Sequence, residues 1–178
     1  MLGILVEGPY DEKILQALIT KITGKRAIIR PVGGKKKLAR KLKGWLEYFR
    51  YQGIDKVLIV RDQDNECIKT IVENLQTKLA GRNYPFEIKF CIIKMTIETW
   101  LLADERAISG VVGKRMPPVQ GILEDIQNPK DRLREILSKA KVAYTDEKAG
   151  HIAAAADLER IASRCPGFHR FRRAVLDC

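Results

Sequence analysis

Along the first hundred positions, short continuous apolar runs alternate with longer segments in which apolar residues recur at helical spacing. The run 57–60, four apolar residues with no polar residue between them, is typical of a strand buried on both faces of a sheet. Strands that alternate with helices indicate a mainly parallel sheet with helices on both faces. The pattern predicts strands at 3–6, 27–32, 56–60 and 86–93, and helices at 11–22, 35–49, 68–79 and 96–103.

The pattern changes beyond this region. Residues 110–121 are rich in glycine and proline and predict a loop, and the segments 123–141 and 151–164 then have helical spacing. A chain of 178 residues normally folds as one domain. We therefore expect an α/β fold with a mainly parallel four-stranded sheet over residues 1–105. A mostly helical C-terminal extension, residues 106–178, is expected to pack on this core as part of a single folding unit.

Positive charge is concentrated in one segment of the chain. The formal net charge is +11, and residues 21–50 contain eleven lysines and arginines against one acid, Glu47. Such a concentration favours a polyanionic partner, usually a phosphate backbone or an anionic membrane, while a solvated, solubilising face is the alternative. No window approaches the roughly 20 apolar residues of a membrane span. We therefore expect nucleic acid as the partner and no membrane.

Other features set the expected compartment and argue against several kinds of site. The first residues lack the basic start and cleavage site of a signal peptide, and the four cysteines form no C-x-x-C pair. We expect a cytoplasmic protein with reduced, mostly buried thiols rather than disulfides or zinc. No G-x-G-x-x-G is present, and residues 110–114 (GVVGK) are too short for a phosphate-binding loop. Dinucleotide and P-loop sites are therefore not expected.

Acidic residues follow three of the four predicted strands. They are Glu7 and Asp11 after the first, Asp62 and Asp64 after the third, and Glu98 and Asp104 after the fourth. Because the carboxyl ends of parallel strands meet at one edge of a sheet, these side chains can converge although they are far apart in sequence. Carboxylates gathered without a cation repel one another, and hard oxygen ligands suit Mg²⁺ or Mn²⁺. The sequence therefore predicts a site for one of these metals.

Several of the acids also have a simpler explanation. Asp11 can cap the first helix, a position that Asp favours. Glu98 can begin a helix because of the helix dipole, and Asp104 fits a surface position. Glu7 and the pair after the third strand are harder to explain this way, because capping does not require two acids on either side of Gln63 at the end of a buried strand.

Together, two of these motifs resemble a known family. Glu7-Gly-x-x-Asp11 after the first strand and Asp62-x-Asp64 after the third are similar to motifs of the Toprim domain of topoisomerases, primases and OLD-type nucleases, over residues 1–105. Later parts of the chain are similar to small stand-alone OLD-like Toprim proteins of bacteria and archaea, many of them catalogued only as a domain of unknown function. These later parts are 98–104, Tyr144, Lys148 and 165–171.

The resemblance implies a role for each matching acid. Glu7 would be the general acid/base or a metal ligand, and Asp62 and Asp64 would hold a divalent cation. Asp11 would support the site, and Glu98 would match the extra acid with which OLD-type members bind a second metal. The chain has no glycine after the D-x-D motif and no recognisable active-site tyrosine region, so a topoisomerase is not expected.

The predicted function is metal-dependent hydrolysis of nucleic-acid phosphodiesters, with DNA favoured over RNA. A pair of Mg²⁺ or Mn²⁺ ions can activate a water and stabilise the leaving oxygen, while a lysine balances charge. Lys148 and Lys94 are the candidates for this lysine, and a solvated surface amine is the alternative for both.

The lysine-rich helix that follows Gly34 is the expected grip on the phosphate backbone. It begins at the edge of the sheet where the acids lie, so its backbone N–H groups and lysines can face the same phosphates. The expected contacts are Lys35, Lys36, Lys37, Arg40 and Lys41. Tyr51 is a candidate for stacking on bases, whereas Trp45 lies on the apolar stripe and is expected in the core.

Two other functions remain open on this sequence. One is a non-catalytic nucleic-acid-binding or regulatory subunit that works with an ATPase or other effector partner, which the net charge favours equally. The other is a Mg²⁺-dependent phosphoryl transfer to or from a nucleotide, against which the lack of a phosphate loop counts. Turnover separates the first of these from a nuclease, and the sequence does not predict the oligomeric state.

Overall fold

The structure, a computed structural model, describes residues 1–177 and contains a four-stranded sheet. Every neighbouring pair of strands is parallel, in the order β2-β1-β3-β4. The predicted α/β class and parallel four-stranded sheet are confirmed. The strands are β1 (Leu2–Val6), β2 (Ile28–Pro31), β3 (Lys56–Asp62) and β4 (Glu87–Ile93).

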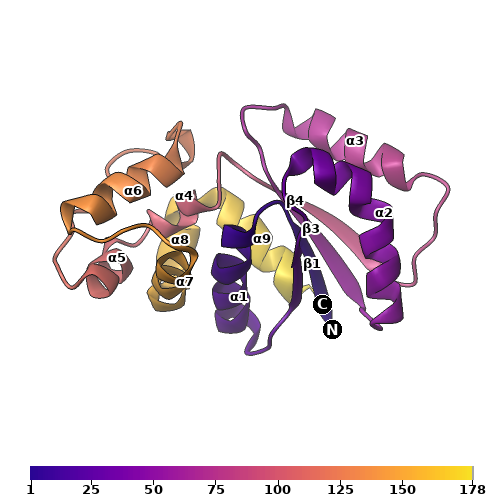
Figure 1. Ribbon diagram of the computed structural model, residues 1–178, viewed down its shortest axis with the longest axis horizontal. Helices are drawn as coiled ribbons and strands as arrows, with labels where there is room; N and C mark the ends of the chain where they lie inside the picture. The colour runs from indigo at the N-terminus through magenta and orange to yellow at the C-terminus, as the bar shows by residue number, and fades with distance from the viewer. Residues whose placement is uncertain (178) are drawn as a thin grey trace.

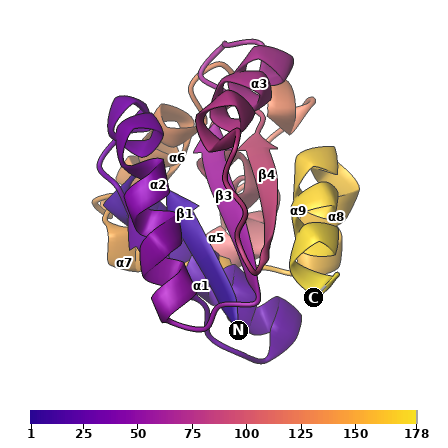
Figure 2. The same ribbon diagram turned by 90° about the vertical axis from the view of Figure 1, so that its right-hand side faces the viewer.

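Helices cover both faces of this sheet (Figures 1 and 2). On one face lie α2 and α3, on the other α1 and α9, and the remaining helices form a group beyond α1 (Figure 1). The helices are α1 (Pro9–Thr23), α2 (Lys35–Tyr51), α3 (Ile68–Leu79), α4 (Glu98–Leu101), α5 (Glu105–Val112), α6 (Pro129–Lys139), α7 (Asp146–Ala155), α8 (Leu158–Arg164) and α9 (Pro166–Leu176), with a 3-10 turn, η1, at Leu123–Asp125.

The continuous apolar run of β3 is explained by two hydrophobic cores, one on each face of the sheet. Successive residues of a strand point to opposite faces, so Val57 and Ile59 join the core under α2 and α3. Leu58 and Val60 join the larger core under α1 and α9. A fully buried side chain of this kind contributes about 1.5–3 kcal/mol through the hydrophobic effect. Both faces therefore need an apolar residue at every position of the strand.

The larger core also holds the C-terminal helices against the sheet. The fully buried Trp100 has its ring centroid 5.2 Å from that of Phe168 and 5.0 Å from that of Phe171. Both phenylalanines belong to α9, which packs on β4 and α1. The last helix thus returns to the sheet and completes the layer that α1 begins.

The C-terminal helices differ in detail from those that the spacing predicts. The segment 123–141 forms η1 and then α6, which begins only at Pro129, a residue suited to the first turn of a helix. The segment 151–164 is divided at Asp157, whose carboxylate accepts hydrogen bonds from the backbone N–H groups of Glu159 and Arg160 and starts α8. Helix α9 was not predicted. Within residues 1–177 no helix is long and apolar enough to cross a membrane.

Candidate metal centre at the carboxyl edge of the sheet

The candidate centre is built where β1, β3 and β4 end. Asp62 is the last residue of β3 and lies opposite Ile93, the last residue of β4. The chain then turns sharply, with Asp64 at φ 48° and Asn65 at φ 63°. Asp and Asn tolerate this left-handed conformation better than most residues. The sequence of the loop therefore fits the abrupt turn that follows β3.

Asp62 carries a carboxylate without a partner. Within the described chain it makes no hydrogen bond or ion pair, although the residue is only partly exposed. Burial raises the pKa of Asp62 well above its ordinary value, and four other carboxylates raise it further by repulsion. These are Asp11, Glu98, Glu7 and Asp64. Four of the acids expected at the metal site therefore lie within electrostatic range of Asp62.

Glu7 follows β1 and is tied to its surroundings by side chain and backbone. Burial raises the pKa of Glu7 to about 7, even though Arg61 opposes the shift; the Arg61 Nε lies 3.2 Å from the Glu7 Oε1. The Glu7 carbonyl accepts hydrogen bonds of 2.8 Å from the backbone N–H groups of both Gly33 and Gly34. Backbone hydrogen bonds therefore hold the loop before α2 against Glu7.

Asp11 caps the first helix, one of the two roles considered for it. Its Oδ2 accepts a 2.9 Å hydrogen bond from the backbone N–H of Gly8, which caps the start of α1. Burial nevertheless raises the pKa of Asp11 to about 6, against the effect of that hydrogen bond, and the charge on Glu98 adds to the rise. Asp11 is thus a capping residue that also lies within electrostatic range of Asp62.

Glu98 is buried, with 3% of the residue exposed, and both of its oxygens have donors. The Tyr144 hydroxyl donates to Oε1 at 2.7 Å, and the Thr96 hydroxyl donates to Oε2 at 2.8 Å. The Lys130 Nζ lies 3.8 Å from Oε1. Burial, and then the Glu98 carboxylate, raise the pKa of Tyr144 well above its ordinary value, so its hydroxyl stays a donor at neutral pH.

Lys130 is a functional candidate that the sequence did not reveal. Its ammonium lies 4.4 Å from the ring centroid of Tyr10, which stacks on Tyr144 at 5.8 Å. Lys130 stands in the first turn of α6, so the C-terminal helices supply a cation to the acidic edge. Its position depends on tertiary packing. The signal in the sequence is only Pro129, which marks a helix start.

The two lysines proposed from the sequence are placed differently. Lys94 pairs with Asp125, at 2.6 Å. Lys148 lies in the first turn of α7, where its backbone N–H donates to the Thr145 hydroxyl at 3.2 Å. Within residues 1–177 the Lys148 ammonium forms no ion pair with the acids around Asp62.

A chain of ion pairs joins the acidic edge to the basic helix α2. Arg61 contacts both Glu7 and Glu66, and the Glu66 Oε1 lies 2.8 Å from the Nζ of Lys35, the first residue of α2. The same ammonium is 3.6 Å from the Asp64 Oδ2. Beyond it, exposed basic side chains continue along the helix; they are Lys36, Lys37, Arg40 and Lys41. The row of predicted phosphate-contacting residues therefore starts at Lys35, in contact with the acidic edge of the sheet.

The aromatic residues of α2 lie as the apolar pattern indicates. Trp45 is partly buried and its ring meets that of Tyr48 edge to face at 5.6 Å. Tyr51, at the end of the helix, is 85% exposed.

Asp104 does not belong to the acidic cluster, and its expected surface position is wrong. The residue is 2% exposed. Its carboxylate accepts hydrogen bonds from the backbone N–H groups of Arg106 at 3.1 Å and Asp157 at 2.9 Å, and so joins the starts of α5 and α8. Burial alone would raise the pKa of Asp104, but these hydrogen bonds outweigh it and lower the pKa.

The acids fit a hard divalent cation by their chemistry, although they are not arranged around one. In the part of the chain that the structure describes, no group of three or more His, Cys, Asp or Glu side chains has a geometry that would hold a metal ion as it stands. Carboxylates without a cation repel one another. An all-oxygen donor set and the unpartnered carboxylate of Asp62 are the features that fit Mg²⁺ or Mn²⁺.

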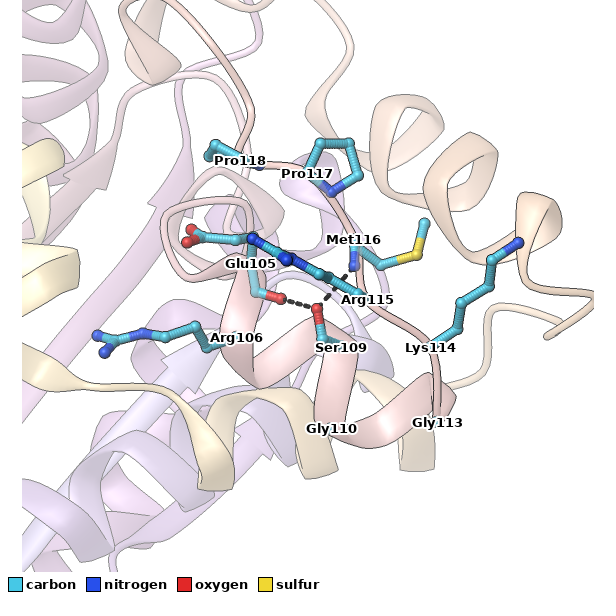
Figure 3. Close-up of a pocket in the computed structure, with 10 residues that line it drawn as sticks. All are labelled: Glu105, Arg106, Ser109, Gly110, Gly113, Lys114, Arg115, Met116, Pro117 and Pro118. Carbon is cyan, nitrogen blue, oxygen red and sulfur yellow. Dashed lines mark hydrogen bonds between the residues drawn. The ribbon is translucent and has the colours of Figure 1, made fainter.

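A hollow of about 300 Å³ opens beside these acids, with Asp64, Thr96 and Lys130 in its lining. A larger hollow of about 870 Å³ lies along α5 and shares no lining residue with it. Figure 3 shows Arg106, Lys114 and Arg115 around the larger one, where the Ser109 hydroxyl donates to the Glu105 carbonyl. The smaller hollow is the one that adjoins the candidate metal centre.

Fold and site together define an α/β domain with a carboxylate cluster at the carboxyl edge of a parallel sheet. The chain belongs to the family described as a domain of unknown function, DUF4276, which matches residues 6–176. No curated protein matches it. Its structure is similar to the C-terminal region of the OLD protein of Xanthomonas campestris pv. campestris, with a TM-score of 0.52 and 16% sequence identity over 98% of this chain and 95% of that one.

At that identity the likeness shows the fold. It supports the expected resemblance to OLD-type proteins at the level of architecture, over both the sheet and the C-terminal helices. The narrower assignment to the Toprim domain remains a prediction.

Proposed function

We propose that the chain is a Toprim-type, OLD-like hydrolase that cleaves phosphodiesters of nucleic acid, DNA in preference to RNA, with Mg²⁺ or Mn²⁺. The observation that carries the proposal is the unpartnered carboxylate of Asp62 with four other carboxylates around it. Such a cluster is costly without a cation, and a bound divalent ion would relieve the repulsion. Glu7, Asp62 and Asp64 are the proposed ligands, with Asp11 in support.

Under this proposal the residues around the ion have separate roles. When bound, a divalent cation supplies an activated water and stabilises the leaving oxygen. Glu7, with a pKa of about 7, can take or release a proton near neutral pH whenever it is not a ligand. Lys130 is the proposed charge-balancing lysine in place of Lys94 and Lys148, because its ammonium adjoins both Glu98 and the hollow beside the acids.

Helix α2 is the proposed grip on the phosphate backbone. Its exposed lysines and arginine start at Lys35, which already contacts Asp64 and Glu66 at the acidic edge. The backbone N–H groups at the start of a helix favour anions. A phosphate backbone lying along α2 would therefore reach the acids around Asp62 without leaving positively charged surface.

The deciding experiment is cleavage of plasmid and oligonucleotide substrates with Mn²⁺ by the wild-type chain and by Asp62→Asn. We expect Asp62→Asn to reduce cleavage at least about 100-fold. Glu73→Gln alters an exposed acid on α3 whose one ion pair within residues 1–177 is with Lys69; this matched control should cleave like wild type. Equal cleavage by wild type and Asp62→Asn would refute the proposal.

A chain that binds the same DNA without Mn²⁺ and leaves it intact would support the alternative, a non-catalytic nucleic-acid-binding subunit. An ATPase or other effector would then supply the activity.

A further inference from the structure

Glu98 and Asp62 are neighbouring carboxylates with opposite surroundings. Asp62 has no donor within the described residues, whereas both oxygens of Glu98 accept hydrogen bonds, one from Tyr144 and one from Thr96. Lys130 adds a positive charge 3.8 Å from the Glu98 Oε1. The charge of Glu98 is therefore already balanced by the protein, while that of Asp62 is not.

Metal binding at Glu98 would disturb this arrangement. A cation on Oε1 would come close to the Lys130 ammonium, which lies 3.8 Å from that oxygen and carries the same sign of charge. A cation on Oε2 would have to share that oxygen with the Thr96 hydroxyl, which uses one of its two lone pairs. The positive charge of Lys130 beside this buried carboxylate therefore opposes a direct metal bond at Glu98.

The donors around Glu98 come from three separate parts of the chain. Thr96 follows β4, Lys130 begins α6, and Tyr144 precedes α7. Tyr144 and Tyr10 stack, and the Lys130 ammonium lies near both rings, at 4.4 Å from Tyr10 and 5.5 Å from Tyr144. Glu98 thus holds the C-terminal helices against the start of α1, beside the acids.

We propose that Glu98 is a positioning residue that fixes Lys130 and Tyr144, and that the centre binds one divalent cation per chain, at Asp62 with Glu7 and Asp64. This inference rests on the proposed function and departs from the second metal that the resemblance implies for Glu98. In place of a second metal ion, the Lys130 ammonium supplies the positive charge beside Glu98.

The test is calorimetric titration of the full chain with Mn²⁺ alone. Wild type should bind one ion, and Glu98→Gln, which keeps an oxygen acceptor but loses the charge, should also bind one with a Kd within about threefold. Asp62→Asn should weaken binding at least about 30-fold. Thermal unfolding of each variant shows whether it is folded, and Tyr144→Phe, a smaller change in the same contact, repeats the test at the partner of Glu98.

A second readout separates positioning from a structural role. Glu98→Gln should lower kcat about tenfold with KM unchanged, and adding Lys130→Met should cause little further loss because Glu98 acts through Lys130. If the losses in kcat caused by Glu98→Gln and by Lys130→Met multiply in the double variant, the two residues act independently and the positioning role is overturned.

The outcomes also distinguish this inference from the proposed function. Two ions in wild type, or loss of an ion in Glu98→Gln, would overturn the inference and leave the proposed function standing. No Mn²⁺ binding by wild type, or binding that Asp62→Asn does not change, would overturn both.

Discussion

The buried carboxylate of Glu124 accepts a 2.6 Å hydrogen bond from the backbone N–H of Gly167, in the first turn of α9. A Cβ at position 167 would lie 2.8 Å from the same Oε1, closer than Cβ atoms approach other atoms in proteins. A negative charge at the start of a helix is favourable because the first N–H groups are unpaired. This contact ties η1 to the helix that returns to the sheet.

Gly167→Ala should therefore destabilise the protein. The added methyl group would push Glu124 out of its hydrogen bond, and we expect a loss of about 1–2 kcal/mol in the free energy of unfolding, measured with urea. Gly44→Ala, inside α2, is the control because a Cβ there would meet nothing within 4 Å. It should stabilise by about 0.5–1 kcal/mol. Equal effects at the two positions would contradict the role of Glu124.

The stability of the metal-free protein should fall as the pH rises through the acidic range. Glu7 has its pKa raised from 4.5 to about 7, and Asp11 from 3.8 to about 6. The folded state therefore binds more protons than the unfolded state between about pH 4 and pH 7, so stability declines across that window. We expect a loss on the order of 2 kcal/mol between about pH 5 and pH 8, measured by urea unfolding in EDTA.

Asp62→Asn tests how far repulsion among the acids adds to that pH dependence. Removing the central charge relieves repulsion, so the metal-free variant should be more stable than wild type at about pH 8, by about 1–2 kcal/mol. Its stability should also change less with pH. A steeper or unchanged pH dependence would show that the acids around Asp62 are not coupled in solution.

Nucleic-acid binding should depend steeply on salt, and α2 should set part of the slope. Replacing Lys36, Lys37 and Arg40 by glutamine removes three exposed charges, and we expect the slope of log K against log salt to flatten by about 2–3. Fluorescence anisotropy with a labelled oligonucleotide at several salt concentrations measures it. An unchanged slope would place the contact surface elsewhere.

The cysteines should differ sharply in reactivity. Burial raises the pKa of both Cys91 and Cys165 to about 12, whereas hydrogen bonds from Thr70 and Lys69 lower the pKa of the exposed Cys67. Iodoacetamide at mildly alkaline pH should label Cys67 rapidly and leave the two buried thiols intact, because the thiolate is the reactive form. Peptide mass mapping measures each site. Cys178, expected from the sequence to be a reduced thiol, lies outside the described residues.

The sheet was predictable because each strand leaves a local pattern. The run from Val57 to Val60 has apolar residues at successive positions only because both faces are covered, and the acids that follow it mark the edge where ligands bind in such sheets. The start of α1 was also readable, since Pro9 and Asp11 are typical of the first turn of a helix. These features depend on residues close in sequence.

Features that depend on distant packing were not predictable. Lys130 reaches Glu98 only because α6 is folded back over the acidic edge, and no spacing in the sequence records that. Asp104 looked like a surface acid because its partner, the backbone of Asp157, lies 53 residues further along. Helix α9 is short and begins with Pro166 and Gly167, and it gains its stability from the core around Trp100.

The hydrogen bonds from Gly33 and Gly34 to the carbonyl of Glu7 have a consequence for the products of cleavage. They fix the start of α2, the proposed phosphate-binding helix, relative to Glu7, the proposed catalytic acid. Under the proposed function, the number of nucleotides between the bound phosphates and the bond that is cut is then constant. Oligonucleotides held at one end would be shortened to fragments of a single length rather than to a broad ladder.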